Sequence, residues 1–288
     1  MKAIFAREVH TYYTTMTGWL FGAFLLLFSG IYTMALCLNG GYAQFEYVLG
    51  NMSFVFLIVT PILTMRVFAE ERRQKTDQLL YSLPMGLSRV VLGKYCGLLA
   101  VLALPLAVTG LYPLILRLYG NVNLKVAYSA LLGFFLLGAA LLAVGMYLSS
   151  LTDSIVGSAA VCFVVVLVNY YLSALASYVP TGDVAALCAL LFLSALAAFV
   201  VLHLTQSPLA GLAALAVCGG AVAAAWFLAR DAFDGLLPAL FKKLCLFESF
   251  YGFLDGVFDW TALCLLCSVC AVFTVLTVQS LEKRRWSE

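Results

Sequence analysis

Residues 127–151 read AYSALLGFFLLGAALLAVGMYLSSL, 25 consecutive positions without a charged side chain. At about 1.5 Å per residue, a helix of this length exceeds the roughly 30 Å of hydrocarbon in a bilayer. A run this long and this apolar is typical of a transmembrane helix. The stretch decides the fold class, because in lipid every backbone polar group must be satisfied internally, as it is in a helix.

Other apolar runs pass the same length test. In chain order the candidate spans are Gly18–Leu38, Met52–Ala69, Val90–Leu116, Ala127–Leu151, Ile155–Ser177, Val184–Leu204, Leu209–Ala229 and Ala262–Leu281. The sixth and seventh are separated only by residues 205–208, so six spans with a partly re-entrant pair is the competing count. We therefore predict an all-α polytopic membrane protein with six to eight transmembrane helices. No internal repeat or low-complexity linker divides residues 1–288, which predicts a single transmembrane domain.

The overall composition agrees with lipid as the main solvent. Of the 288 residues, 64% are hydrophobic and 10% are charged, whereas soluble domains carry about 25% charged residues. The net charge of +2 gives no basis for nucleic-acid binding. The nine cysteines lie scattered in apolar runs, and the stripe Cys264, Cys267 and Cys270 lacks a fourth ligand. We interpret these cysteines as packing residues and expect no metal site.

The basic residues give the orientation. Eleven of the sixteen Lys and Arg fall in loops on the side of the N-terminus, and cytoplasmic loops are the ones enriched in these residues. An even number of spans brings the C-terminus to the same side. We expect both termini in the cytoplasm and the chain in the cell (inner or plasma) membrane.

Three segments are amphipathic rather than spanning. Residues 1–17 suit a helix lying at the cytoplasmic interface. Residues 70–84, within the loop 70–88, form a charged helix that starts with two glutamates and ends at Pro84. Residues 237–258 interleave phenylalanines with charged side chains and are interpreted as an extracytoplasmic interfacial or re-entrant segment. The loop 70–88 is either a solvated connection or a stiff helix that inserts into a groove of a soluble partner.

Several motifs resemble one family. AEERRQKTDQLLYSLP at 69–84, followed by LGK at 92–94, is similar to the stretch that joins the second and third spans of ABC-2 type transporter permeases. FESFYGFLD at 247–255, the ending LEKRRW at 281–286 and Phe5-x-x-Glu8 resemble the gliding-motility ABC permease subfamily. The chain departs from the family pattern at Lys75 and Gln78, where the family has Gly and Glu.

The resemblance implies a type V exporter-like permease that pairs as a homo- or heterodimer and binds ABC ATPase subunits. ATP and Mg would be bound by the ATPase, and no cofactor is expected in this chain. Residues 70–84 would form the coupling helix, and the segment before the last span an extracytoplasmic gate. The residues implied for the ATPase contact are Glu70, Glu71, Arg72 and Arg73, with Leu79, Leu80 and Tyr81 as an apolar anchor; the gate candidates are Phe247, Phe250 and Phe253. Glu70 and Glu71 are alternatively helix-capping residues.

The sequence gives no support for catalysis in this chain. Six residues separate Gly86 from Gly93, and Tyr95 follows Lys94, whereas a phosphate-binding Walker A loop needs four residues and a Ser or Thr. No paired carboxylates or Ser-His-Asp set stand out. Asp153 is interpreted as the N-cap of the fifth span or as a second ATPase-facing turn. We therefore expect a permease that exports an unidentified substrate; the alternatives are an ion-coupled secondary carrier and a non-transporting scaffold or membrane enzyme.

Overall fold

The computed structural model describes residues 2–41, 44–75, 86–178, 236–256 and 259–287, and every regular element within them is a helix. This confirms the predicted all-α class. Contacts divide the chain into two compact units, the first made of Met1–Tyr170 with Leu246–Glu288 and the second of Tyr171–Cys245. The expected single domain stays a prediction.

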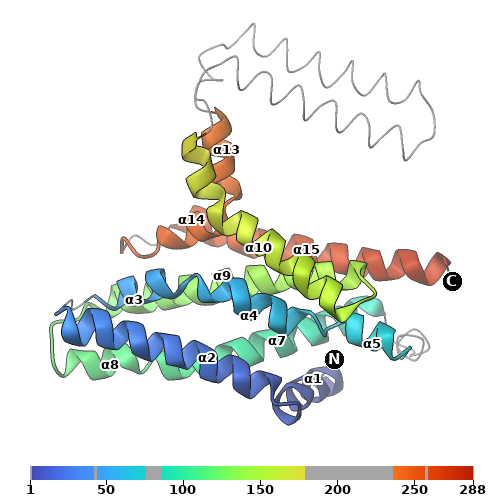
Figure 1. Ribbon diagram of the computed structural model, residues 1–288, viewed down its shortest axis with the longest axis horizontal. Helices are drawn as coiled ribbons and strands as arrows, with labels where there is room; N and C mark the ends of the chain where they lie inside the picture. Colours follow the sequence, from blue (N-terminus) through green and yellow to red (C-terminus); the bar gives the residue numbers. More distant parts are fainter. Residues whose placement is uncertain (1, 42–43, 76–85, 179–235, 257–258, 288) are drawn as a thin grey trace, which may run out of the picture. The chain divides into compact units, whose positions relative to one another are not determined.

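The first unit contains most of the described helices (Figure 1). They are α1 (Lys2–Thr14), α2 (Thr17–Tyr32), its π-helical continuation η1 (Thr33–Asn39), α3 (Phe45–Met52), α4 (Val55–Thr64), α5 (Ala69–Arg73), α7 (Leu87–Thr109), α8 (Tyr112–Arg117), α9 (Leu124–Leu151), α14 (Leu246–Tyr251) and α15 (Trp260–Ser287). The helix α10 (Ile155–Tyr178) begins in the first unit and ends in the second, which also contains α13 (Leu236–Leu244).

Five described helices are long and apolar enough to cross a membrane. They cover Thr17–Asn39, Leu87–Arg117, Leu124–Leu151, Ile155–Tyr178 and Trp260–Arg284, and a bent pair of helices makes a sixth candidate. These six correspond to six of the eight predicted spans. The other two, Val184–Leu204 and Leu209–Ala229, lie outside the described residues. Large apolar side chains such as Trp19, Leu27 and Ile31 are exposed along α2, as expected of a surface in contact with lipid.

The second span differs from its prediction. We expected one span over Met52–Ala69, but the candidate span starts at Phe45 and bends by 58° between Met52 and Val55. Pro61 lies inside α4. Around the bend the backbone N–H groups of Ser53, Phe56 and Leu57 bond carbonyls three residues earlier. Such tight turns interrupt an α-helix without a proline.

The helix α9 is the centre of the first unit and packs against α4, α7 and α15 (Figure 1). Its glycines allow this close packing. A Cβ on Gly138 would lie 2.8 Å from Leu102, and one on Gly145 would lie 2.5 Å from Thr64. Small residues at helix contacts are typical of membrane proteins, because close backbone approach supplies packing energy that lipid cannot supply.

Candidate functional site

Four charged side chains from three separate helices, α1, α5 and α7, meet near one end of the first unit, which we call the charged end. The helices α1 and α5 and the C-terminus lie in the same half of this unit (Figure 1). The ammonium group of Lys94, on α7, lies 3.0 Å from the Glu8 carboxylate of α1 and 2.8 Å from the Glu71 carboxylate of α5. The side chain of Lys94 is 3% exposed. Lys94 also donates a hydrogen bond of 3.0 Å to the Val67 carbonyl. Arg7 completes the group, which we call the Lys94 cluster (Arg7, Glu8, Glu71 and Lys94).

The charges of the Lys94 cluster balance. The guanidinium of Arg7 lies 3.1 Å from Glu71 and 3.6 Å from Glu8, so two cations face two carboxylates. A buried ammonium is tolerated only when it is paired and hydrogen-bonded, because its desolvation costs several kcal/mol. Here Lys94 has two carboxylates and one carbonyl as partners. Each of the three segments is therefore needed to complete the surroundings of one buried cation.

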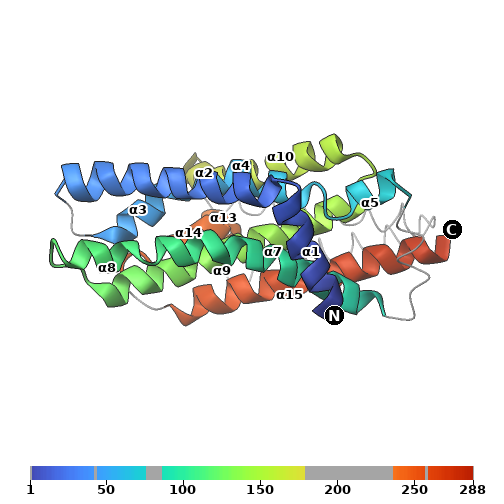
Figure 2. The same cartoon turned by 90° about the horizontal axis from the view of Figure 1, so that it is seen from below.

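The N-terminal helix α1 is seated on α7 by close backbone approach (Figure 2). A Cβ on Gly97 would lie 2.9 Å from the Glu8 Cβ, so a larger residue would push α1 away from Lys94. The phenol of Tyr12 donates a hydrogen bond of 2.9 Å to the Leu63 carbonyl. Burial, with a smaller contribution from Glu8, raises the pKa of Tyr12, so this phenol stays protonated as a donor.

Two arginines cap the C-terminus of α9. Arg72 of α5, whose side chain is 8% exposed, donates to the carbonyls of Ser150 and Thr152. Arg284 of α15 donates to the Leu151 carbonyl at 2.8 Å. The last carbonyls of a helix lack intrahelical partners, and this end of the helix dipole attracts cations. We call Arg72 and Arg284 the α9 cap; it ties α5 and α15 to the same helix end.

The start of α5 is attached to α9 as well. The backbone N–H groups of Phe68 and Ala69 both lie 3.3 Å from the Ser149 hydroxyl oxygen, which accepts from them. The first N–H groups of a helix need such external acceptors. Because Ser149 contacts the beginning of α5 and Arg72 extends from it, α5 is held against α9 at two points.

Asp153 has a different role from the one expected. The helix α10 is capped by its neighbour, since the Ser154 hydroxyl accepts a hydrogen bond of 2.8 Å from the Gly157 N–H. The carboxylate of Asp153 instead lies 2.8 Å from Arg284 and 3.2 Å from Arg72. Reading Asp153 as the N-cap was wrong, because a sequence does not show that two distant arginines converge on it. Hydrogen bonding from Arg284, with the added charge of Arg72, lowers the pKa of Asp153.

This lowered pKa predicts a pH-dependent contribution to stability. A carboxyl whose pKa falls on folding stabilises the folded state above its ordinary value of 3.8, and the contribution is lost as pH falls through the lowered value. We expect the wild-type chain to be more stable than Asp153→Asn at pH 7, with a difference that shrinks below about pH 4. Thermal unfolding in detergent across this range measures it. A difference that stays constant down to pH 2 would contradict the assignment.

The charged helix expected over residues 70–84 is interrupted early. Within the described residues α5 ends at Arg73, and Lys75 adopts a left-handed backbone with φ of 54°. The N–H of Lys75 bonds the Arg72 carbonyl at 2.9 Å. A residue in this conformation after the last helical turn ends a helix and favours glycine. Lys75 stands where the ABC-2 pattern has Gly. The left-handed backbone at this position therefore suits the glycine of the family pattern better than it suits lysine.

Replacing Lys75 with glycine is therefore expected to stabilise the fold. The left-handed conformation costs an L-residue about 1 kcal/mol more than it costs glycine. We expect Lys75→Gly to raise the free energy of unfolding by about 1 kcal/mol. Gln74→Gly is the matched control, since Gln74 is right-handed with φ of −87°, and it should be neutral or destabilising. Equal effects of the two variants would contradict this account of the helix end.

The predicted contact residues divide into two groups. Glu71 and Arg72 point into the Lys94 cluster and the α9 cap, as described above. Glu70 is partly exposed and lies 3.9 Å from Arg66, and Arg73 is exposed. The predicted apolar anchor of Leu79, Leu80 and Tyr81 lies outside the described residues.

The three phenylalanines predicted as a gate lie at the opposite end of the first unit. Phe247, Phe250 and Phe253 are all fully buried. The Phe250 ring centroid lies 5.7 Å from that of Phe134 on α9. Phe253 packs on Gly133, where a Cβ would lie 2.8 Å from its ring. These side chains fill the space between helices rather than forming an exposed interfacial surface.

Comparison with known proteins decides the family. A family model for ABC-2 family transporter proteins matches residues 33–286. The chain belongs to the ABC-2 transporter family. No curated protein and no solved structure shows significant similarity to the chain.

Family membership accounts for the apolar spans of this chain. This permease is a multi-pass protein of the cell membrane and a membrane-spanning component of an ATP-binding cassette transporter. Such components are not catalytic and associate with an ATPase subunit. At the charged end α5 is bonded to α1, α7 and α9, and buried ion pairs and exposed charges lie together there.

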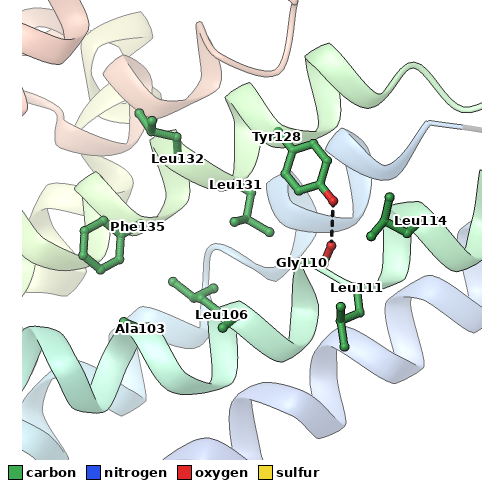
Figure 3. Close-up of a pocket in the computed structure, with 10 residues that line it drawn as sticks. Ala103, Leu106, Gly110, Leu111, Leu114, Tyr128, Leu131, Leu132 and Phe135 are labelled. Atoms are coloured by element: carbon green, nitrogen blue, oxygen red, sulfur yellow. Dashed lines mark hydrogen bonds between the residues drawn. The ribbon is translucent and has the colours of Figure 1, made fainter.

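A groove between α7, α8 and α9 has a different character (Figure 3). It has a volume of about 650 Å³ and is lined by Ala103, Leu106, Ala107, Gly110, Leu111, Leu114, Tyr128, Leu131, Leu132 and Phe135. The Tyr128 hydroxyl donates to the Gly110 carbonyl at 3.1 Å, which satisfies the one polar side chain in the lining. In a permease this surface suits lipid chains and offers no group for chemistry.

Sequence reasoning missed the central residues of the charged end. Glu8 and Lys94 both occur in the motifs that resemble the family, yet nothing in their spacing shows that they meet. Arg284 was used only for orientation and as part of the LEKRRW ending. One signal in the sequence was available. Lys94 follows one apolar turn at the start of the predicted span Val90–Leu116, and a charged side chain inside a span needs a partner.

Proposed function

We propose that this permease exports its substrate with energy from ATP hydrolysed by a separate ATPase subunit that binds at the charged end. ATP and Mg would be bound by that subunit. The proposal includes cytoplasmic termini and a second permease copy or a related permease as dimer partner. The resemblance of residues 69–94, 247–255 and 281–286 to gliding-motility ABC permeases supports that subfamily.

The observation that carries the proposal is the bracing of α5. Through Glu71 it contacts α1 and α7, and through Arg72 it contacts α9 and the α15-bound Asp153. A force applied to the exposed side of α5 would therefore reach several spans at once. This is the arrangement that a coupling segment between an ATPase and a permease needs.

The division of the predicted contact residues refines this role. Arg73, which is exposed, and Glu70, which is partly exposed, would contact the ATPase. The expected anchor Leu79, Leu80 and Tyr81, outside the described residues, would take part in the same contact. Glu71 and Arg72 would pass the motion to the spans. The aromatic segment with Phe247, Phe250 and Phe253, at the other end, would act as the extracytoplasmic gate, since its displacement would open the space between α4 and α9.

Co-purification tests the contact. The permease, expressed with its ATPase in mild detergent, should recover the ATPase in stoichiometric amount. Arg73→Glu should reduce that recovery severalfold, because it reverses an exposed charge on α5. Arg117→Glu is the matched control, since Arg117 is also exposed but lies at the opposite end. Equal recovery with both variants would contradict the assigned contact, and ion-driven transport without any ATPase would contradict the function.

A further inference from the structure

A second, polar pocket lies at the end of the first unit opposite the Lys94 cluster. It has a volume of about 810 Å³ and is bounded by the start of α3, the connection from α8 to α9, and the turn after α14 (Figure 1). We call it the distal pocket. Its polar lining residues are Gln44, Glu46, Tyr47, Asn121, Asn123 and Asp255.

Glu46 is the unusual member of this lining. The residue is 8% exposed, and its Oε2 atom is buried without a hydrogen-bond partner. No salt bridge in the described part of the chain involves Glu46. A buried carboxylate oxygen that lacks a hydrogen-bond partner is costly, since it loses hydration without compensation. The position of the Glu46 carboxylate in a pocket therefore indicates a ligand that pairs with it.

The other lining groups specify the charge of that ligand. Asp255 adds a second carboxylate at an exposed position, and among the residues that the structure describes no Lys or Arg lines the pocket. Gln44, Asn121 and Asn123 bring amide oxygens that accept hydrogen bonds. Val126 and Leu254 provide apolar wall. The set favours a ligand that is cationic, donates several hydrogen bonds and carries a small apolar part.

A bare metal ion fits this lining less well. Within the described residues no three His, Cys, Asp or Glu side chains gather closely enough to hold a metal. The volume of the pocket is also many times that of an ion with its ligands drawn in. A primary ammonium group on an organic molecule matches both the acceptors and the space.

We propose that the distal pocket binds the protonated amine of an organic ligand, with Glu46 as its buried charge partner and Asp255 at the rim. The same chemistry is carried by a free amine and by the headgroup of phosphatidylethanolamine. The site does not depend on the ATPase or on the direction of transport. Its failure would leave the proposed function untouched.

Ethanolamine is the probe for the first test. The full chain, in nanodiscs of phosphatidylglycerol, is titrated with ethanolamine hydrochloride against sodium chloride of equal ionic strength, and the melting temperature is followed. We expect a saturable rise for the wild type. Glu46→Gln should raise the half-saturating concentration of ethanolamine about tenfold, which corresponds to the loss of one charged hydrogen bond. Glu282→Gln, an exposed glutamate outside the pocket, is the matched control and should match the wild type.

Two further measurements make the result decisive. Glu46→Gln without ligand should melt at or above the wild-type temperature, because it removes an unpaired buried carboxylate. If this variant does not fold, Asp255→Asn, at an exposed position, replaces it and should also weaken binding.

The lipid composition separates the two sources of the amine. Nanodiscs of phosphatidylethanolamine should abolish the response to added ethanolamine if the headgroup is the ligand, and should leave the response unchanged if a free amine is the ligand. No rise with ethanolamine, an equal rise in Glu46→Gln, or a rise with calcium chloride alone would overturn the proposal.

Discussion

Lys94→Met is expected to lower the free energy of unfolding of the permease by about 3 kcal/mol or more. The substitution keeps much of the side-chain length but removes the ammonium. Glu8 and Glu71 would then both lose the ammonium that lies within 3.0 Å of them, at a place where the Lys94 side chain was 3% exposed. Leaving buried carboxylates without their cation is among the larger destabilising changes known for single substitutions.

Chemical unfolding in mixed detergent micelles, followed by tryptophan fluorescence, measures the loss. Lys283→Met is the control, because Lys283 is exposed and near the same end. Adding Glu8→Gln to Lys94→Met should recover part of the lost stability, since it removes one of the two carboxylates that lost the Lys94 ammonium. A Lys94→Met permease as stable as the control would show that the cluster contributes nothing.

Arg72→Leu is expected to cost about 2 kcal/mol of stability, and more importantly to separate binding from coupling. The substitution removes the donors that cap the Ser150 and Thr152 carbonyls at the end of α9. It also leaves Asp153 with Arg284 alone. Since Arg72 is 8% exposed, its loss should not remove the surface that faces the ATPase.

The neighbouring Arg73→Leu gives a matched comparison. Arg73 is exposed, so its loss should leave stability within about 0.5 kcal/mol of the wild type while weakening recovery of the ATPase. Arg72→Leu should show the reverse pattern, with the ATPase recovered but its hydrolysis no longer responsive to the permease. If both variants lose ATPase binding to the same degree, the division of α5 into an inner and an outer side is wrong.

The sequence predicted the class of fold and most of the spans for a simple physical reason. Transmembrane helices are recognisable from local composition, because lipid demands an apolar run of a fixed length. The run at 127–151 became α9, which ends at Leu151 as expected. The bend at Ser53 escaped prediction, since the turn there contains no proline that would mark it in the sequence.

The charged end shows the limit of such reasoning. The motif at 69–84 gave Glu71 and Arg72 the same expected role as Glu70 and Arg73. The position of Glu71 follows from its contact with Lys94, 23 residues away in the chain, and that of Arg72 from its contact with Thr152, 80 residues away. Contacts over such distances follow from helix packing, which a single sequence does not reveal.

We propose that nucleotide binding to the ATPase, docked at the charged end, moves helices through the Lys94 cluster. Ser53 is a suitable reporter at the other end of α4, because it is fully buried and its hydroxyl lies 3.2 Å from that of Tyr251. The measurement is the maleimide labelling rate of Ser53→Cys, in a permease lacking its native cysteines and bound to its ATPase, with and without ATP and vanadate. We predict a severalfold faster rate with nucleotide, and no change when Lys94→Met is added. Equal rates with and without nucleotide, or the same acceleration in the Lys94→Met complex, would contradict the claim.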